Sequence, residues 1–229
     1  MERWESFQRQ KGNIAGAEMA KVLRDQFGDV PLPSVATPEI SLEIEWNRQA
    51  QNLAGFFAKE LKFKTPEGYI TTLPKFEPQP ENWKGRLDTP VIVETRIRPE
   101  RQAQLVGMYY FLIEGTKTDW NKEIKNYLIP NAPYAAWLED GRNNRNRRPK
   151  DVRRNLKPDE IAGTELDGIA LYISNPKILG YHFLDLPGTS IGSDHTAMLT
   201  VSSGKTVMSH SSTEEATPFF GSVIRGRQK

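Results

Sequence analysis

The stretch TPEISLEIEWNRQAQNLAGFFAKELKF, residues 37–63, decides the class of fold that this sequence predicts. It begins with a threonine that can cap a helix, a proline at the first helical position and an acid in the first turn. Apolar side chains then recur at helical spacing and share one stripe, at Leu42, Trp46, Leu53, Phe57 and Leu61. Because Thr65-Pro66-Glu67-Gly68 ends the pattern, we predict one amphipathic helix from residue 37 to about residue 63.

Beyond this helix the sequence has the texture of short strands. Apolar segments alternate with Gly, Pro, Ser and Asn, and Ser202-Ser203-Gly204-Lys205 is typical of a hairpin turn. The predicted strands are 69–73, 90–98, 104–113, 167–174, 180–186, 195–201 and 205–209. We therefore predict an α+β fold, with one main amphipathic helix packed on a twisted, mostly antiparallel sheet, N- and C-terminal arms and long loops.

The chain divides at the start of the helix. Residues 1–36 form an N-terminal arm with a proline-rich linker, because Pro31 and Pro33 disfavour helix in the residues before them. Residues 37–229 form a single α+β domain with a basic loop insertion at 142–158. The segment 218–225 is either a short helix or an anchoring segment, and a basic tail follows it.

The overall charge argues against a dedicated nucleic-acid-binding protein. The chain has 31 Lys and Arg against 29 Asp and Glu, and a net charge of +2 is not the large basic surplus of that class. No window approaches the roughly 20 apolar residues of a membrane span, so we expect no membrane contact. The start is too polar for a secretory signal, and the absence of cysteine excludes disulfides and thiolate sites and fits synthesis in a reducing cytoplasm.

The histidines offer only weak candidates for metal binding. A site could be drawn from His182, Asp185, Asp194 and His195. In a strand, however, residues three apart point to opposite faces, and so do direct neighbours. Helical ligand spacing is also missing, so we predict no metal and no cofactor.

A hydrolase reading is no stronger. Ser190, Ser193 or Ser209 could act as a nucleophile, but residues 188–192 do not have the G-x-S-x-G register of a nucleophile elbow. The same stretch lacks the lysine of a phosphate-binding loop. We predict that the chain is not an enzyme, and keep a hydrolase that uses His182 or His195 as a third alternative.

A basic run is the sharpest charge feature of the sequence. It is opposed only by Asp151 and consists of Arg142, Arg145, Arg147, Arg148, Lys150, Arg153, Arg154 and Lys157. Arginine makes good phosphate contacts, so the run can bind nucleic acid; the other interpretation is a solvated loop or one that pairs with acids of a neighbouring subunit. No aromatic residue interrupts the run, so base stacking is not indicated.

Four phrases in collinear order resemble the neck and tail-completion proteins of tailed bacteriophages. They are an amphipathic helix, a glycine-x-leucine phrase, a signature of the form Y-A-x-x-[VL]-E-x-G and a proline-phenylalanine phrase. Here they correspond to residues 42–61, Gly85-Arg86-Leu87, residues 134–141 and Pro218-Phe219-Phe220. The fixed positions of the signature are occupied by Tyr134, Ala135, Leu138, Glu139 and Gly141. The sequence departs from the pattern at Lys84 and Arg142, where threonine is usual, and in the long separation of the last two phrases.

The resemblance implies a non-enzymatic virion structural protein, made in the host cytoplasm, that joins or completes the tail. It implies a homo-oligomeric ring, possibly a hexamer, whose partners are other neck or tail proteins. The residues predicted to contact subunits or packaged DNA are Arg142, Arg145, Arg147, Arg148, Lys150, Arg153 and Arg154. The alternative function is a nucleic-acid-binding accessory protein that uses the arginine-rich residues 142–157.

Overall fold

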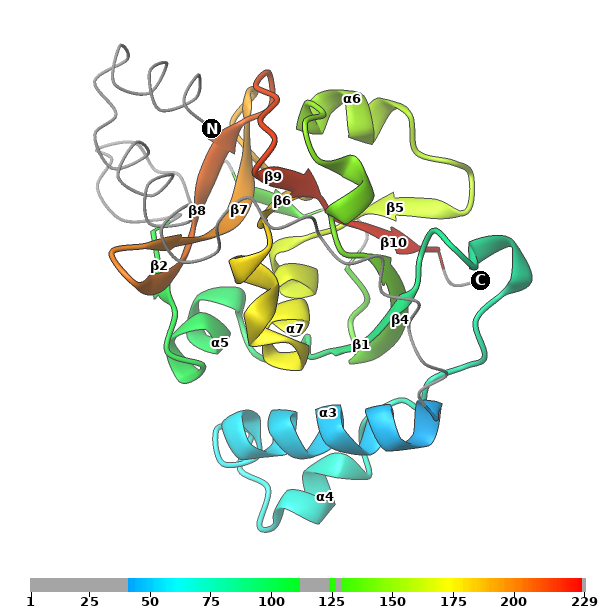
Figure 1. The fold of residues 1–229 in the computed structure, drawn as a ribbon. Coiled ribbons are helices and arrows are strands. Elements are labelled where there is room, and N and C mark those ends of the chain that lie inside the picture. The colour runs from blue at the N-terminus through cyan, green and yellow to red at the C-terminus, as the bar shows by residue number, and fades with distance from the viewer. Residues whose placement is uncertain (1–40, 112–123, 127–128, 228–229) are drawn as a thin grey trace.

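The computed structural model describes residues 41–111, 124–126 and 129–227. Helices and two β-sheets make up this part of the chain, which confirms the predicted α+β class (Figure 1). The strands form two sheets and not the single sheet that was predicted. The predicted N-terminal arm, 1–36, lies outside the described residues.

The first sheet, sheet A, is antiparallel throughout. Its strands follow the order β1 (Thr89–Val93), β4 (Tyr134–Glu139), β10 (Ile224–Gly226) and β5 (Glu160–Ala162). In the long pair, Thr89 lies opposite Leu138 and Val93 lies opposite Tyr134. The signature phrase is thus an inner strand of sheet A.

The second sheet, sheet B, is mixed. Its order is β2 (Tyr109–Tyr110), β8 (Lys205–Ser212), β7 (His195–Ser202), β6 (Phe183–Ile191) and β3 (Ile124–Asn126), with β9 (Phe220–Ser222) also paired to β6. The β2–β8 and β6–β9 pairs are parallel, and the other pairs are antiparallel. The predicted hairpin between β7 and β8 is confirmed: Ser203 and Gly204 both have positive φ, as a tight two-residue turn requires.

One short segment near the C-terminus connects the two sheets. β9 pairs with β6 in sheet B, and after Val223 the chain continues as β10 between β4 and β5 in sheet A. Val223 itself is fully buried, and its N–H donates to the carbonyl of Asp185, at 2.9 Å. The sequence predicts either a short helix or an anchoring segment for residues 218–225. The structure has two strands in this region, and they hold both sheets together.

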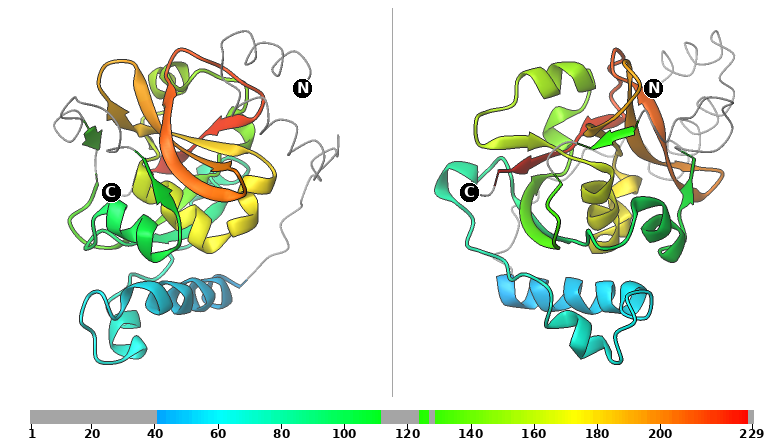
Figure 2. Two further views of the ribbon diagram at one scale, coloured as in Figure 1. Left: turned by 90° about the vertical axis from the view of Figure 1, so that its left-hand side faces the viewer. Right: turned by 180° about the vertical axis from the view of Figure 1, so that it is seen from behind.

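The predicted long helix is present as α3 (Leu42–Phe57), and it is shorter than expected. It buries Trp46, Leu53 and Phe57 from the predicted stripe, and its end differs because the chain turns away after Phe57. Lys62 has a φ of 60°, and the N–H of Phe63 reaches back to the carbonyl of Ala58, at 2.9 Å. Figures 1 and 2 show α3 together with α4 (Pro66–Ile70) at one end of the molecule.

Helix α3 also closes one edge of sheet A. The Gln49 side chain donates to the carbonyl of Pro90, at 2.7 Å, and accepts from the N–H of Ile92, at 2.9 Å. It therefore satisfies both kinds of backbone group on the free side of β1, as a neighbouring strand would do. The predicted packing of the main helix on the sheet is realised at this edge.

The central helix of the fold is α7 (Glu165–Ser174), a segment predicted as a strand for residues 167–174. This prediction was wrong, because Thr164 and Asp167 form a capping box that starts a helix. The helix is buried along nearly its whole length and packs against β1, β6 and β7, strands of both sheets. The apolar residues of this segment predict a buried strand, because periodicity alone does not distinguish a buried strand from a buried helix.

Two further predicted strands are largely helical. Residues 69–73 overlap α4, which Thr65 caps by accepting from the N–H of Gly68, at 3.2 Å. Residues 104–113 include the end of α5 (Pro99–Leu105) and only the two residues of β2 within the described part. The strands predicted at 90–98, 180–186, 195–201 and 205–209 correspond to β1, β6, β7 and β8 with shifted bounds.

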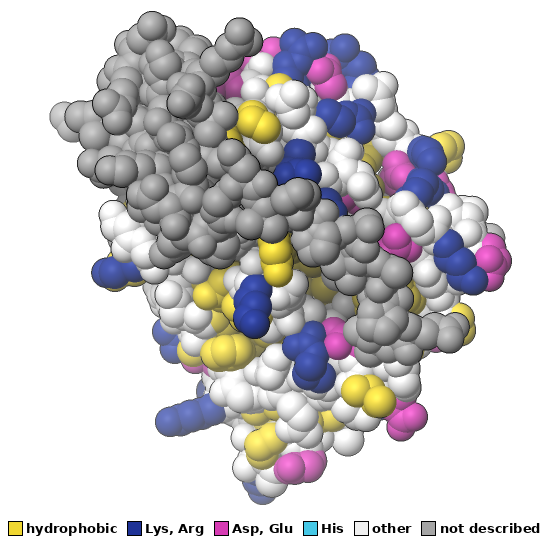
Figure 3. All heavy atoms as spheres, viewed as in Figure 1, with side chains coloured by type: hydrophobic (Ala, Val, Ile, Leu, Met, Phe, Trp, Pro, Cys, Tyr) yellow, Lys and Arg dark blue, Asp and Glu magenta, His cyan; other side chains and the backbone are white. Residues whose placement is uncertain are grey.

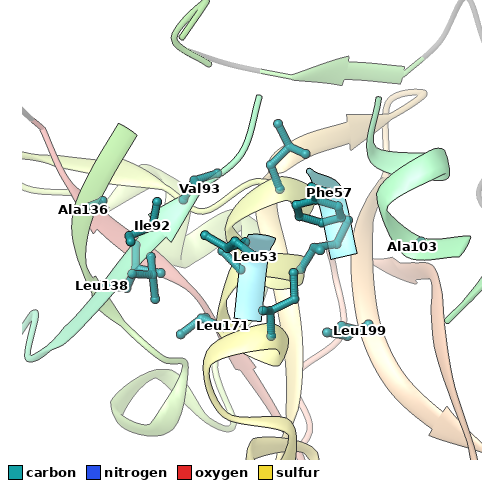
Figure 4. Close-up of a cluster of buried hydrophobic side chains, with 14 of the residues drawn as sticks. Leu53, Phe57, Ile92, Val93, Ala103, Ala136, Leu138, Leu171 and Leu199 are labelled. Carbon is teal, nitrogen blue, oxygen red and sulfur yellow. The ribbon is translucent and has the colours of Figure 1, made fainter. Parts of the chain in front are cut away.

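The main hydrophobic core lies between α3, α7 and the two sheets. Figure 4 shows Leu53 and Phe57 of α3 beside Leu171 of α7, with Ile92 of β1 and Leu199 of β7 around them. All five side chains are buried. A smaller cluster of Trp83, Leu87, Val152 and Ile224 lies apart from this core.

Candidate interaction surface formed by residues 134–157

The signature residues are part of the interior of the protein. Tyr134, Ala135, Leu138, Glu139 and Gly141 are all buried. The Tyr134 hydroxyl donates to Oδ1 of Asp167, at 2.8 Å, and burial is the main reason that the pKa of this phenol is raised well above its usual value. The signature strand is thereby tied to the first turn of α7.

A buried arginine completes this contact. The Arg225 guanidinium lies over the Tyr134 ring, 4.6 Å from its centroid, and its Nε is 3.8 Å from Oδ2 of Asp167. The same carboxylate accepts from the N–H and the hydroxyl of Thr164, at 2.7 and 2.9 Å. Tyr134, Asp167 and Arg225 therefore join β4, α7 and β10 in one polar cluster.

Glu139 organises the turn that leaves the signature strand. Its carboxylate accepts from the N–H of Gly141, at 3.0 Å, from the N–H of Asn143, at 2.7 Å, and from Nδ2 of Asn144, at 2.7 Å. Burial raises the pKa of Glu139 to about 7, although these three hydrogen bonds favour the ionised form. The Glu139 side chain is thus a buried clamp on the turn.

Gly141 is required by its backbone and by its neighbour. Its φ of 93° belongs to a region that L side chains rarely adopt. A Cβ at this position would also lie 2.5 Å from the carbonyl oxygen of Gly221, and a Cβ on Gly221 would overlap the backbone of Gly141. Two glycines thus allow the end of β4 to contact β9 directly, which links the signature to the C-terminal phrase.

The basic run is a folded segment and not the long loop that was predicted. It contains a short 3₁₀ turn, η3 (Arg142–Asn144), and the helix α6 (Pro149–Arg154). Its backbone is attached to residues 213–221: Asn146 donates to the carbonyl of Thr217, at 2.9 Å, Lys150 donates to that of Thr213, at 3.2 Å, and Arg145 forms an isolated bridge with Gly221.

The basic side chains have different roles. Arg153 is half-buried and donates through Nε to the carbonyl of Pro187, at 2.9 Å, so it holds α6 on sheet B. Lys150 forms an ion pair with Glu214, and Arg145 is half-buried with Nε 3.4 Å from the carbonyl of Arg142.

Four arginines of the run remain exposed, namely Arg142, Arg147, Arg148 and Arg154. Arg142 lies 3.2 Å from Asp140, and Arg148 lies 2.6 Å from Asp151. Figure 3 shows Lys and Arg side chains gathered at the end of the molecule where α6 lies in Figure 1.

The residues considered as metal ligands make several different contacts. His182 is buried, its Nε2 donates to the carbonyl of Asp140, at 2.8 Å, and burial lowers its pKa. Asp185 accepts from the Ser211 hydroxyl, at 2.7 Å, and burial raises its pKa to about 7. His195 contacts Asp194 through Nδ1, at 2.9 Å. Among the described residues, no three His, Asp or Glu side chains are placed to hold a metal ion.

The candidate nucleophiles occupy three different positions of sheet B. Ser190 is buried in β6 opposite Thr196, Ser193 is exposed in the turn before β7, and Ser209 lies opposite Met198. The hydrolase alternative stays a prediction, because these positions do not test it.

Several residues of this region were not singled out from the sequence. Asn144, Asp167, Gly221 and Arg225 each contact a signature residue or its turn. Only Asp167 carried a local signal, the spacing of Thr164 and Asp167 at a helix start. The others depend on contacts between strands that are far apart in the sequence.

No protein-family model, curated protein or solved structure matches this chain. Within the described ranges, no helix is long and apolar enough to cross a membrane.

Proposed function

We propose that this chain is a non-enzymatic structural protein of the neck or tail of a phage or phage-like particle. In this role it forms a closed ring that joins or completes the tail, and the resemblance suggests six copies. Its partners are further copies of itself and other neck or tail proteins, and its location is the virion after synthesis in the host cytoplasm. A ring follows naturally from repeating one heterologous interface until it closes.

One observation carries this proposal: three of the phrases behind the resemblance meet around sheet A. The signature strand β4 pairs with β10, and residues 221–223 separate β10 from the C-terminal phrase. The glycine-x-leucine phrase lies beside them, because Leu87 packs with Trp83 and Ile224. Arg86 of the same phrase pairs with Glu160 of β5.

This convergence supports the interpretation that the phrases belong to one structural pattern. Phrases that belong to one structural pattern are expected to pack together, as these do in one sheet and a small core. The fourth phrase, the helix, closes the edge of the same sheet through Gln49. The titratable groups near these phrases are engaged in structural contacts, which is consistent with a protein that does no chemistry.

The test is the location and the assembly state of the protein. Mass spectrometry of purified particles is expected to find the chain at a fixed copy number, and native mass measurement is expected to give one discrete multiple of the 26.1 kDa chain. Particles that lack the chain and still join heads to tails normally would reject the proposal.

The exposed arginines favour a second candidate, a nucleic-acid-binding accessory protein that acts through residues 142–157. The same measurements distinguish the two. A monomer that is absent from particles and changes mobility with DNA would favour this second candidate.

A further inference from the structure

We propose that the exposed arginines of the basic run form a preorganised surface for the sugar–phosphate backbone of double-stranded DNA. The arginine surface consists of Arg142, Arg147, Arg148 and Arg154, with the half-buried Arg145 among them. A buried clamp of Glu139 and Asn144 holds its geometry. The inference rests on a nucleic-acid contact, which both functions proposed above allow.

The clamp extends from the interior to the arginine surface in two steps. Nδ2 of Asn144 donates to Glu139, at 2.7 Å, and to the carbonyl of Ser222, at 3.0 Å, so its amide is fixed from two sides. The other end of the same amide, Oδ1, accepts from Nη1 of Arg147, at 2.8 Å. Because Glu139 also binds the backbone on both sides of Arg142, one buried carboxylate orients two exposed arginines.

The rest of the segment is held equally firmly. Val152 of α6 is buried in the small cluster with Trp83, Leu87 and Ile224, and Arg153 is bound to the carbonyl of Pro187. A backbone that is already ordered does not lose conformational entropy when a ligand binds, so only side chains need to be fixed. This is the sense in which the surface is preorganised.

The charges of the surface suit phosphate. Arg142 and Arg148 pair with Asp140 and Asp151, but these arginine side chains stay 42% and 46% exposed. Exposed ion pairs are weak, whereas the planar guanidinium group binds phosphate with two parallel hydrogen bonds. The two aspartates therefore leave these arginines available to phosphate and do not neutralise the excess of positive charge.

The chemistry favours the backbone of a duplex over bases or a single strand. Residues 142–157 contain no aromatic side chain on which an unpaired base could stack. Their backbone is bound to residues 213–221 and does not project as a free loop, so insertion into a groove is not its geometry. Duplex DNA carries a dense and regular array of phosphates, which several fixed arginines can contact without reading sequence.

The first experiment measures binding of the full chain to a fluorescent duplex of random sequence over a series of salt concentrations. The test variant carries Arg142→Ala, Arg147→Ala and Arg148→Ala. The matched control carries Lys59→Ala, Lys64→Ala and Arg98→Ala, which are exposed basic residues outside the run. Both variants lose the same net charge.

The test variant is expected to bind at least about tenfold more weakly, with the slope of log K against log salt reduced by about 1 for each arginine. The control is expected to retain the wild-type slope. Equal losses in both variants would mean a general charge effect and would overturn the arginine surface, as would wild-type affinity in the test variant. A wild-type chain that binds no DNA would reject the nucleic-acid contact itself and leave the particle location to be decided by its own test.

The second experiment tests the clamp by a double-mutant cycle on the same DNA. If Asn144 acts by positioning Arg147, Asn144→Ala weakens binding, and adding it to Arg147→Ala causes little further loss. A general structural role would weaken binding by the same factor in both backgrounds. Equal factors, in variants shown to be folded by circular dichroism, would overturn the positioning role of Asn144.

Discussion

The signature strand and the basic run follow each other in the sequence and are opposite in character. In residues 134–141 nearly every side chain is buried, and the polar ones hold other elements in place. In residues 142–157 the backbone is fixed by the interior, while four arginines extend into solvent. The comparison shows that residues 134–141 are part of the scaffold, and that the adjacent run carries the exposed charges.

The two regions meet at Glu139 and Gly141. These residues belong to the signature, yet their contacts determine where the basic run begins and which way it leaves the sheet. Glu139 and Gly141 therefore support the surface that the basic run forms. The following predictions test whether changes in the scaffold affect only stability, and whether changes in the arginine surface affect only DNA binding.

Gly221→Ala is expected to have the largest effect. The new methyl group would overlap the backbone of Gly141, and neither strand can move without disturbing its own sheet. We expect a loss of about 3 kcal/mol or more in the free energy of unfolding, measured by urea denaturation. Gly55→Ala is the control, because an added Cβ there meets nothing within 4 Å. A stable Gly221→Ala variant would show that the close contact between β4 and β9 is not needed.

Glu139→Gln is expected to change how stability depends on pH. The pKa of Glu139 is about 7 in the folded chain against an ordinary value of 4.5, so the folded state binds more protons between these values. The stability that this group contributes is complete below pH 4.5 and is lost as the pH rises through 7.

The Glu139→Gln variant has no group that titrates at this position. Its free energy of unfolding minus that of the wild type should therefore be about 3 kcal/mol larger at pH 8 than at pH 4. Denaturation series at several pH values measure this difference, with the exposed Glu67→Gln as control. A constant difference across the range would contradict the buried, titrating clamp.

Tyr134→Phe removes a single hydroxyl from the scaffold. Asp167 would lose one buried hydrogen bond, while the ring could still pack under Arg225. We expect a loss of about 1–3 kcal/mol in the free energy of unfolding, with DNA binding unchanged in the folded variant. Tyr181→Phe is a suitable control because its side chain is exposed. Weaker DNA binding by the Tyr134 variant would show that scaffold and surface are coupled.

The combined change of Arg142, Arg147 and Arg148 to Ala is expected to have the smallest effect on stability. Arg142 and Arg148 form exposed ion pairs, which contribute about 0–1 kcal/mol each, and the exposed Arg147 donates a hydrogen bond to Asn144. We expect thermal and urea unfolding close to that of the wild type. A loss above about 3 kcal/mol would show that these arginines belong to the scaffold.

The sequence predicted the parts of the fold that have local signals. The amphipathic stripe of α3, the strand β7 and the turn at Ser203-Gly204 were all predicted. The end of α3 was placed too late, because the residues after Phe57 keep an apolar pattern while the backbone turns. Helix α7 is buried along nearly its whole length and so has little polar face. The sequence therefore predicts a strand where the structure has this helix.

The candidate surface was predicted less well than the fold. The basic residues were identified by composition, but their division into structural and exposed groups was not accessible from the sequence. Arg153 and Arg154 are neighbours, and only the position of α6 on sheet B makes one half-buried and the other exposed. The clamp was also missed, because a glutamate at the end of a strand is usually a surface residue.

The passage of residues 220–226 through both sheets sets a condition on the order of folding. β10 lies between β4 and β5, both of which precede it by more than 60 residues (224 − 162 = 62 for β5), so sheet A is divided until this segment arrives. During synthesis on the ribosome, sheet B cannot be completed before residue 222, nor sheet A before residue 226, has left the exit tunnel. Until then, β4 and β5 present unpaired edges that can pair with other chains. The protein should therefore be most prone to aggregate just before its synthesis reaches this segment, and a chain that stops short of it should be found among insoluble material.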